Sequence, residues 1–351
     1  MKKLIVGPYP PPAGGVATWT LEYISYFRAL GEEILLVDTS LTGRRAQSFG
    51  KKRSLVAEAR RCFRIWSSLG KCLRKGRPEL VHMNVNCSPA GTIRDLISAI
   101  IVRNRKTPLI LHCHCNIEDQ IGSGRLANRA LKTLLGIADG IIVLNSKSYS
   151  YVSRTVEVKT AIIPNFIKEA VDTPKPVSDD VNAVLFAGHV SKAKGIDEIL
   201  ELAGLKKNVR FILAGPVAEE YREIYDKGGL ENVVFTGELS HENTLELMRK
   251  SDVFLFPSYT EGFSMALLEA MAAGLPCIAT DVGANADMLE GKGGIVVKAK
   301  DVNELKRALD SIEAKETRQA MSLWNVGKVK SAYTIESVVK QLNLFYSEVV
   351  K

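Results

Sequence analysis

The chain has 351 residues, which corresponds to about two domains at roughly 150 residues per domain. Its 46% hydrophobic and 25% charged residues are ordinary for a soluble globular protein and exclude a disordered chain, a coiled coil and a collagen-like fibre. The net charge of +8 conceals an asymmetry, because residues 1–175 hold 27 Lys and Arg against 13 Asp and Glu, whereas the remainder holds 20 against 26.

Short apolar runs alternate with helical patterns along the chain. We expect two series of six strands, at residues 4–7, 34–38, 80–85, 109–113, 140–144 and 160–163, and at residues 182–187, 209–214, 233–236, 253–256, 277–280 and 294–297. This alternation indicates an α/β protein with parallel sheets and helices on both of their faces. Residues 164–181 hold three prolines and little apolar periodicity, so they are interpreted as a linker between two domains.

One long amphipathic pattern runs from about residue 325 to the end of the chain, and we expect it to pack across both domains. Near the middle of the chain, the longest uncharged apolar run, residues 96–102, is far shorter than the ~20 residues that a membrane span needs. The apolar run before Gly7 is also too short for a signal-peptide core. We therefore expect a cytoplasmic protein whose six cysteines are reduced thiols.

The first candidate site is the Gly14-Gly15 pair, which lies between the first strand and a helix. Glycines there let the backbone approach a ligand closely and direct helix N-terminal amides at an anion. An ordinary strand-to-helix turn is the alternative. The dinucleotide fingerprint is excluded, because no Gly-x-Gly-x-x-Gly pattern occurs at this position.

The second candidate is the run His112-Cys113-His114-Cys115 at the end of a predicted strand. On a strand the two histidines share one face and the two cysteines share the other, so the four side chains do not converge as a tetrahedral metal site requires. A histidine at the carboxyl end of a parallel strand is better placed to contact a ligand.

Two further motifs lie in the second half. Lys194 follows the strand at 182–187 and precedes a helix, where a phosphate is commonly held, although a solvated loop lysine is the alternative. In the segment 257–276, Glu261 lies in a loop before a helix and Glu269 lies inside that almost wholly apolar helix. A carboxylate in such a helix is costly unless it is paired or bound to a ligand, and carboxylates accept hydrogen bonds from sugar hydroxyls.

The two acids eight residues apart, followed by Ala-Met-Ala-Ala-Gly-Leu-Pro, resemble the signature of retaining GT-B glycosyltransferases of family four (group 1), used in bacterial polysaccharide and lipid-linked saccharide synthesis. The resemblance covers nearly the whole chain. It implies two Rossmann-like domains facing a cleft, residues 1–165 for the acceptor and 166–325 for the nucleotide-sugar donor. It also implies a C-terminal helix, residues 326–351, that packs back on the N-terminal domain.

The resemblance also implies roles for individual residues. Lys194 is similar to the lysine that neutralises the donor diphosphate, Glu269 to the acid on the nucleotide ribose, and Glu261 to the acid beside the transferred sugar. His114 resembles the histidine near the reacting sugar. The remaining expected donor-binding residues are Gly14, Gly15, His189, Gly237, Gly262, Phe263 and Ser264, with histidine at 189 where the family often has arginine.

The resemblance implies a hexosyltransferase that retains anomeric configuration and needs neither a cofactor nor a bound metal, which agrees with the absence of an Asp-x-Asp motif. The expected partners are a nucleotide sugar, most simply a UDP-sugar, and a saccharide or lipid-linked acceptor. The alternatives are a GT-B sugar-nucleotide epimerase and a GDP-mannose-dependent mannosyltransferase. A nucleic-acid partner is not expected, because no recognition module is visible.

Residues 44–77 hold 12 Lys and Arg and only one acid, Glu58. Apolar residues recur there at helical spacing, at positions 55, 56, 59, 63, 66, 69 and 73, which places most of them on one face. A basic helix with such a face is suited to an anionic bilayer surface, so we expect peripheral association with the inner face of the plasma membrane. The alternative is that this face packs on its own sheet.

Overall fold

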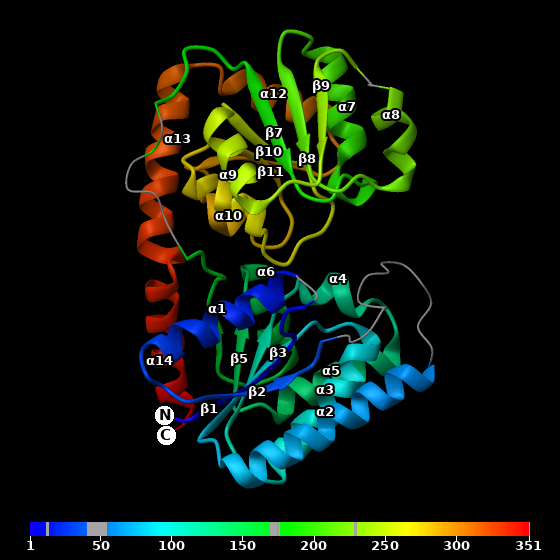
Figure 1. Cartoon of the computed structure of the whole chain (residues 1–351), viewed down its shortest axis with the longest axis vertical. Coiled ribbons are helices and arrows are strands. Elements are labelled where there is room, and N and C mark those ends of the chain that lie inside the picture. The colour runs from blue at the N-terminus through cyan, green and yellow to red at the C-terminus, as the bar shows by residue number, and fades with distance from the viewer. Residues whose placement is uncertain (12–13, 41–54, 169–173, 175, 228–229, 351) are drawn as a thin grey trace. The chain divides into compact units, whose positions relative to one another are not determined.

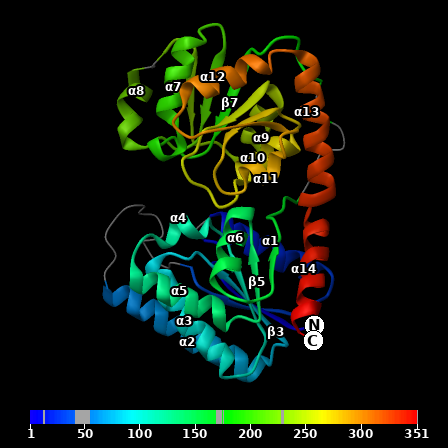
Figure 2. The ribbon, with the colours of Figure 1, turned by 180° about the vertical axis from the view of Figure 1, so that it is seen from behind.

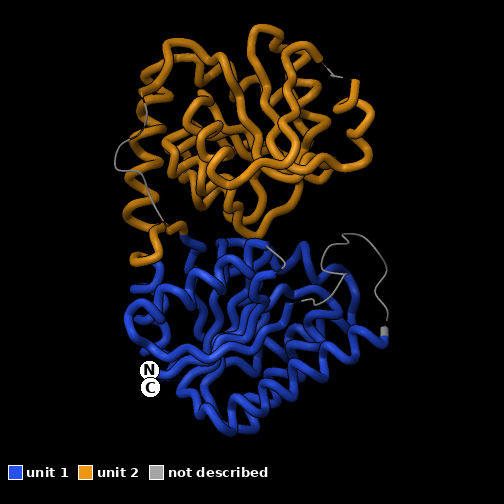
Figure 3. Tube along the Cα trace, viewed as in Figure 1, with its two compact units in different colours: residues 1–166, 338–351 blue, residues 167–337 orange. Residues whose placement is uncertain are grey.

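The structure is a computed structural model that describes residues 1–11, 14–40, 55–168, 174, 176–227 and 230–350. The chain divides into two compact units (Figure 3), residues 1–166 with 338–351 (unit 1) and residues 167–337 (unit 2). Parts of three predictions lie outside the described residues: the loop before Gly14, the basic stretch 44–54 and much of the predicted linker.

Unit 1 is built on a parallel sheet of six strands in the order β2-β1-β3-β4-β5-β6. The strands are β1 (Lys3–Gly7), β2 (Ile34–Asp38), β3 (Leu80–Val85), β4 (Leu109–Cys113), β5 (Gly140–Val143) and β6 (Thr160–Ile162). β1, β3, β4 and β5 are buried along their whole length, which is why their sequences are continuous apolar runs rather than alternating ones.

Six helices and the end of a seventh surround this sheet (Figure 1): α1 (Gly15–Ala29), α2 (Leu55–Gly76), α3 (Pro89–Arg103), α4 (Ile117–Ile121), α5 (Arg125–Ile137), α6 (Ser146–Thr155) and α14 (Ile335–Val349). α3 packs against both α2 and α5. α14 lies beside α1 in both views (Figure 2), and the hydroxyls of Tyr346 and Tyr23 are 3.2 Å apart. From residue 338 onward, the C-terminal helix therefore belongs to unit 1.

Unit 2 has a second parallel sheet in the order β12-β11-β10-β7-β8-β9. Its strands are β7 (Ala183–Ala187), β8 (Arg210–Ala214), β9 (Val233–Gly237), β10 (Val253–Phe256), β11 (Cys277–Thr280) and β12 (Gly294–Val297). Its helices are α7 (Ile196–Leu205), α8 (Arg222–Lys227), α9 (His241–Lys250), α10 (Met265–Ala272), α11 (Asn285–Leu289), α12 (Val302–Ser311) and α13 (Lys315–Lys328). The predicted α/β class with two parallel sheets is confirmed.

The long C-terminal pattern is not the single helix that the sequence predicts. α13 ends at Lys328, a π-helical segment follows at Val329–Tyr333, and α14 starts after Thr334. Thr334 is extended and bridges to Ile167, which lies in the predicted linker. Apolar periodicity continues through this break because the segments on both sides of it bury one face.

The prediction of one apolar membrane face on α2 is wrong in part. Leu69 and Leu73 are buried in the core of unit 1, because a crossover helix must bury a face against its sheet. Phe63 is 71% exposed and Val56 is 61% exposed, so the predicted apolar residues do not share a single face of α2. No helix among the described residues is long and apolar enough to cross a membrane.

Candidate functional site

The predicted phosphate and sugar residues of unit 2 lie at the carboxyl ends of β7 and β10. These strands are neighbours in the sheet although β8 and β9 come between them in sequence. The connections therefore leave in opposite directions here, and the crevice outside such a switch point is where open α/β sheets bind ligands. Lys194 follows β7 and Glu261 follows β10, so the topology brings together two residues that are 67 positions apart.

Lys194 Nζ forms an ion pair with Glu261 Oε1. The Glu261 side chain is only 12% exposed and that of Lys194 is 28% exposed, so the pair is largely shielded from water. The Lys194 ammonium also lies 5.5 Å from the centre of the Phe256 ring. Each of the two predicted residues therefore neutralises the charge of the other.

Two glycines allow the loop that carries Glu261 to approach its neighbours closely. Gly195 has φ +75°, and a Cβ there would lie 2.2 Å from the carbonyl oxygen of Pro257. Gly283 has φ +52°, and a Cβ there would lie 2.4 Å from the carbonyl oxygen of Glu261. The loop is also held by the Tyr259 amide, which donates to the carbonyl of Ala193 at 2.9 Å.

The helix α10 begins where the sequence predicts it. Ser264 is its N-cap, and its hydroxyl accepts from the Leu267 amide at 3.1 Å. The hydroxyl is thereby occupied within the fold, so Ser264 offers a ligand its backbone rather than its side chain. Phe263 is buried against Tyr333, with ring centres 6.0 Å apart. The carbonyl of Gly262 accepts from the Ala284 amide at 3.1 Å.

Glu269 lies within α10, with its side chain 21% exposed and one oxygen 3.8 Å from His241 Nδ1 on α9. Burial raises the pKa of Glu269, and the neighbouring His241 opposes that shift. Because burial disfavours the ionised carboxylate, a further hydrogen-bond donor beside Glu269 would stabilise it. Sequence reasoning missed His241, because its contact with Glu269 joins two helices with no common motif.

His189 follows β7 and Gly237 ends β9, at the same edge of the sheet. His189 is exposed two residues after β7, and Gly237 ends β9 with φ +69°. The Gly237 carbonyl accepts from the Gly215 amide at 2.9 Å. His189 lies in the same β7–α7 connection as Lys194. Among the described residues, however, no contact of its side chain holds it beside the Lys194–Glu261 ion pair.

Unit 1 has its own switch point, between β1 and β3. A cavity of about 310 Å³ lies there, and its lining includes Gly14, Gly15, Asn84, Arg61 and Arg94. A Cβ built on either glycine would find no described atom within 4 Å, so packing of the described residues does not require glycine at these positions. The glycines instead leave the backbone at the start of α1 open toward the cavity.

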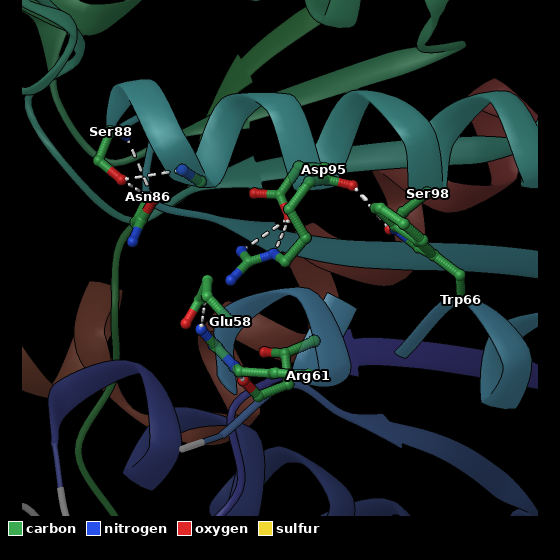
Figure 4. A network of polar contacts seen from close by, with 10 residues as sticks. Glu58, Arg61, Trp66, Asn86, Ser88, Asp95 and Ser98 are labelled. Carbon is green, nitrogen blue, oxygen red and sulfur yellow. Dashed lines mark hydrogen bonds and ion pairs between the residues drawn. The ribbon is translucent and has the colours of Figure 1, made fainter. Parts of the chain in front are cut away.

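Each of the two arginines of this cavity pairs with an acid, Arg61 with Glu58 (Figure 4) and Arg94 with Asp95. Arg94 pairs with Asp95 at 2.7 Å, and Arg61 donates to Glu58 at 2.7 Å and to the carbonyl of Thr39. Burial raises the pKa of Asp95 to about 6, although Arg94 acts in the opposite direction. The guanidinium groups are thereby fixed in position, which suits recognition of an oxygen-rich ligand.

His114 lies directly after β4, as predicted, and is partly exposed, whereas His112 is fully buried. Their rings are 3.9 Å apart, so they share a face as strand geometry requires. Among the residues that the structure describes, no group of three or more His, Cys, Asp or Glu side chains is arranged to hold a metal ion. The six cysteines, all of them described, are free thiols.

The predicted site residues thus fall into two groups. Gly14, Gly15 and His114 belong to unit 1, and Lys194, His189, Gly237, Glu261, Gly262, Phe263, Ser264 and Glu269 belong to unit 2. Within unit 2 the structure brings Lys194 to Glu261 and places Glu269 on the helix that follows. No sequence motif marks Gly283 or Asn84, because each acts through a contact between distant segments.

Comparison with known families agrees with both halves of this architecture. The model described as "Glycosyl transferases group 1" matches residues 168–323, and the model described as "Glycosyltransferase Family 4" matches residues 13–170. The chain belongs to the group 1 glycosyltransferases, and its fold is GT-B. The family and the fold that the sequence motifs indicate are therefore confirmed.

Relatives of this glycosyltransferase act in glycolipid and polysaccharide synthesis. It is 33% identical to the alpha-galactosylglucosyldiacylglycerol synthase of Streptococcus pneumoniae over 38% of this chain and 41% of that protein. It is 24% identical to the lipopolysaccharide core biosynthesis mannosyltransferase LpsB of Rhizobium meliloti over 96% of this chain and 95% of that one. The chain thus spans less than half of the first relative and nearly all of the second.

Solved structures share the fold at low identity. HepE of Anabaena in complex with UDP superposes with a TM-score of 0.77 and 16% identity, covering 99% of this chain and 100% of that one. Sucrose-phosphate synthase of Thermosynechococcus elongatus has the same TM-score at 17% identity, with 99% of each chain covered. These likenesses establish the shared fold of the glycosyltransferase.

Proposed function

We propose that this glycosyltransferase moves a sugar, with retention and without a bound metal, from a UDP-sugar to a saccharide or lipid-linked saccharide acceptor in cell-envelope or exopolysaccharide synthesis. The observation that carries the proposal is the Lys194–Glu261 ion pair at the switch point of unit 2, next to the N-terminus of α10. Retention is supported by the likeness of the Glu261-to-Glu269 motif to retaining members of the family.

The residues of unit 2 supply the chemistry that departure of a nucleotide diphosphate needs. Lys194 brings a cation, and the first amides of α10 bring the positive end of a helix dipole, so negative charge developing on the diphosphate is stabilised. Glu269 accepts hydrogen bonds from ribose hydroxyls, because its partly buried carboxylate has His241 as a distant partner at 3.8 Å. Glu261 stabilises positive charge that develops on the transferred sugar.

The nature of the donor is supported by solved GT-B relatives, since HepE is described in complex with UDP and with UDP-glucose. The acceptor class is supported by relatives named as glycolipid and lipopolysaccharide enzymes. The cavity of unit 1, with Arg61, Arg94 and two asparagines in its lining, offers an acceptor saccharide directional hydrogen bonds.

A donor panel tests the proposal. Purified protein is incubated with UDP-, GDP- and dTDP-sugars, with and without lipid-linked and soluble saccharide acceptors. We expect UDP release that depends on acceptor, and a product whose anomeric configuration matches the donor by NMR. Epimerised donor in the absence of acceptor would identify a sugar-nucleotide epimerase, and turnover of GDP-mannose alone would identify a mannosyltransferase. An inverted anomer would refute retention.

We further propose that unit 1 contacts an anionic membrane through the outer faces of α2, α3 and α5, which pack side by side. Exposed apolar side chains lie on all three helices: Val56, Phe63, Ile93, Ile100 and Leu126. Exposed bases accompany them: Arg60, Arg64, Lys71, Arg74, Lys75, Arg103, Arg125, Arg129 and Lys132. Within the described side chains of these helices no acid is exposed, since Glu58 pairs with Arg61 and Asp95 is buried.

This arrangement fits an anionic bilayer better than a neutral one. Each basic residue near such a surface contributes about 1 kcal/mol, and apolar side chains enter the boundary between headgroups and acyl chains. The surface differs from the predicted helix alone, because α3 and α5 contribute Ile93, Ile100 and Leu126, the last of which is 86% exposed.

Vesicle co-sedimentation tests the membrane proposal. We expect binding to vesicles containing phosphatidylglycerol, weak binding to pure phosphatidylcholine, and loss of binding at high salt. The variant Phe63→Ser/Ile93→Ser should bind several-fold more weakly. Leu344→Ser is the matched control, because Leu344 is 63% exposed on α14 and lies outside this surface. Equal binding to both lipids, or an equal loss in the control, would refute the assignment.

A further inference from the structure

A chain of hydrogen bonds inside unit 1 connects the C-terminal helix to His114. The Tyr346 hydroxyl on α14 lies 2.8 Å from His82 Nδ1 and 3.2 Å from the Tyr23 hydroxyl. His82 Nε2 lies 3.1 Å from Asn84 Oδ1, and the same oxygen lies 3.1 Å from His114 Nε2. One atom of Asn84 is therefore shared by two imidazole rings.

This sharing forces the two histidines into the same tautomer. If the shared atom is the amide oxygen, it can only accept, so both Nε2 atoms must carry a proton. If it were the amide nitrogen, both Nε2 atoms would have to be unprotonated. The side of Asn84 that faces the histidines thus decides the protonation of His82 and His114 together.

Thr20 decides which way Asn84 is turned. The Thr20 hydroxyl donates to the carbonyl of Val16 at 2.8 Å, one turn earlier in α1. Its single proton is thereby used, so its oxygen is left as an acceptor. Asn84 Nδ2 donates to that oxygen at 3.0 Å, which turns Oδ1 toward the two histidines.

The rest of the chain of hydrogen bonds agrees with this direction. With its proton on Nε2, His82 has Nδ1 as an acceptor, and Tyr346 donates to it while accepting from Tyr23. His112 Nδ1 lies 3.2 Å from His82 Nε2 and accepts as well, which puts the His112 proton on Nε2, a buried atom with no partner among the described residues. Trp19 packs on three imidazoles of this cluster, with ring centres 5.1 to 5.3 Å away, and so restricts their rotation.

The consequence for His114 is an unprotonated Nδ1. This nitrogen is buried and has no hydrogen-bond partner among the described residues. Burial lowers the pKa of His114 to about 3, with His82 as a second cause, so the ring is neutral at ordinary pH. A buried acceptor without a partner costs about 1–3 kcal/mol, and such exceptions in native proteins call for a functional reason.

We propose that Asn84 is a positioning residue that holds His114 as the neutral Nε2–H tautomer, so that Nδ1 accepts a hydrogen bond from a hydroxyl of the bound sugar or acceptor. This inference rests on the proposed function and on the likeness of His114 to the family's histidine near the reacting sugar. It assigns to Asn84 and Thr20 a role that no sequence motif marks. It also makes His114 a hydrogen-bond acceptor rather than a general acid.

Nitrogen-15 NMR of histidine-labelled protein tests the tautomer without any substrate. The chain has five histidines, so single His→Gln variants can assign each ring. We expect His82 and His114 to show a protonated Nε2 and an unprotonated Nδ1 across pH 6–8. A protonated Nδ1 on His114, or different tautomers on the two rings, would overturn the proposal.

Variants of Asn84 then connect the tautomer to turnover. Asn84→Leu removes both amide bonds at similar volume, and we expect a mixed tautomer on His114 and a fall in kcat of about tenfold or more, with donor KM changed far less. Asn84→Asp keeps an acceptor toward the rings and should restore the Nε2–H tautomer. Tyr346→Phe is the control, because it breaks the chain of hydrogen bonds beyond His82 and should leave the His114 tautomer unchanged.

The NMR measurement and the turnover measurement together distinguish a failure of this inference from a failure of the proposed function. If NMR shows the expected tautomer but the protein turns over no nucleotide sugar, the proposed function is refuted. The role of Asn84 in setting the His114 tautomer would still stand. If the protein transfers sugar but the His114 tautomer is unchanged in Asn84→Leu, the positioning role of Asn84 is refuted. The glycosyltransferase assignment would still stand.

Discussion

Substitution of Lys194 and substitution of Glu261, each made alone, should change the affinity for UDP in opposite directions. Glu261 Oε1 neutralises the Lys194 ammonium, so an incoming diphosphate competes with that carboxylate. Lys194→Ala removes the cation and should weaken UDP binding. Glu261→Gln removes the competitor, so it should strengthen UDP binding while it lowers turnover.

The size of each effect follows from the burial of the pair. A hydrogen bond to a charged group contributes about 1.5–3 kcal/mol, so Lys194→Ala should weaken UDP binding by about 10-fold to 150-fold. Because Lys194 is 28% exposed, the pair lies toward the weak end for ion pairs, and we take about 0.5–1 kcal/mol for its release. That corresponds to UDP binding about twofold to fivefold tighter in Glu261→Gln.

Isothermal titration calorimetry with UDP measures both effects, and steady-state kinetics measures turnover. Lys192→Ala is the matched control, because Lys192 is two residues away, is 71% exposed and pairs with Asp197 at 3.4 Å. It should bind UDP as the unmodified protein does. UDP binding by Lys194→Ala within threefold of the unmodified protein would refute the reasoning, as would a tenfold loss of affinity in Glu261→Gln.

Three other outcomes are expected. Glu269→Gln should lower kcat/KM for the donor by about 30-fold to 1000-fold, corresponding to 2–4 kcal/mol, and activity within threefold of the unmodified protein would contradict the ribose contact. Turnover should persist in excess EDTA, and a complete loss restored by a divalent metal would show metal dependence. Gly283→Ala should destabilise the protein in urea more than Gly291→Ala does. Both glycines have a positive φ, but only the Cβ at 283 meets the Glu261 carbonyl, and equal losses would show that this contact is unimportant.

The strands could be predicted closely because a parallel sheet buries both of its faces. All twelve predicted strands are present, and six of them have the predicted bounds: β2, β3, β4, β10, β11 and β12. Segments with less distinct patterns were harder to predict. The break at Thr334 has no glycine or proline to mark it, and the periodicity of apolar residues is the same on its two sides.

Site residues could be proposed from sequence where a motif is local. The spacing of Glu261, Glu269 and the C-terminal Gly274 describes one loop and one helix, and the structure has that loop and that helix, with Gly274 at φ +75° after its end. The pairing of Lys194 with Glu261 depends instead on strand order. Sequence alone does not reveal that order, because β8 and β9 intervene between the two strands.

The C-terminal helix shows why a residue's role can depend on segments that are distant in sequence. The apolar pattern of α14 predicts only that one face is buried, and Leu342, Phe345 and Tyr346 are buried in unit 1. Gly140 makes that approach possible, because a Cβ there would lie 2.7 Å from the Val349 side chain. Once α14 is seated, the Tyr346 hydroxyl satisfies His82 Nδ1, which would otherwise be a buried acceptor without a partner. The helix that completes the core of unit 1 therefore also completes the polar cluster on which the orientation of His114 rests.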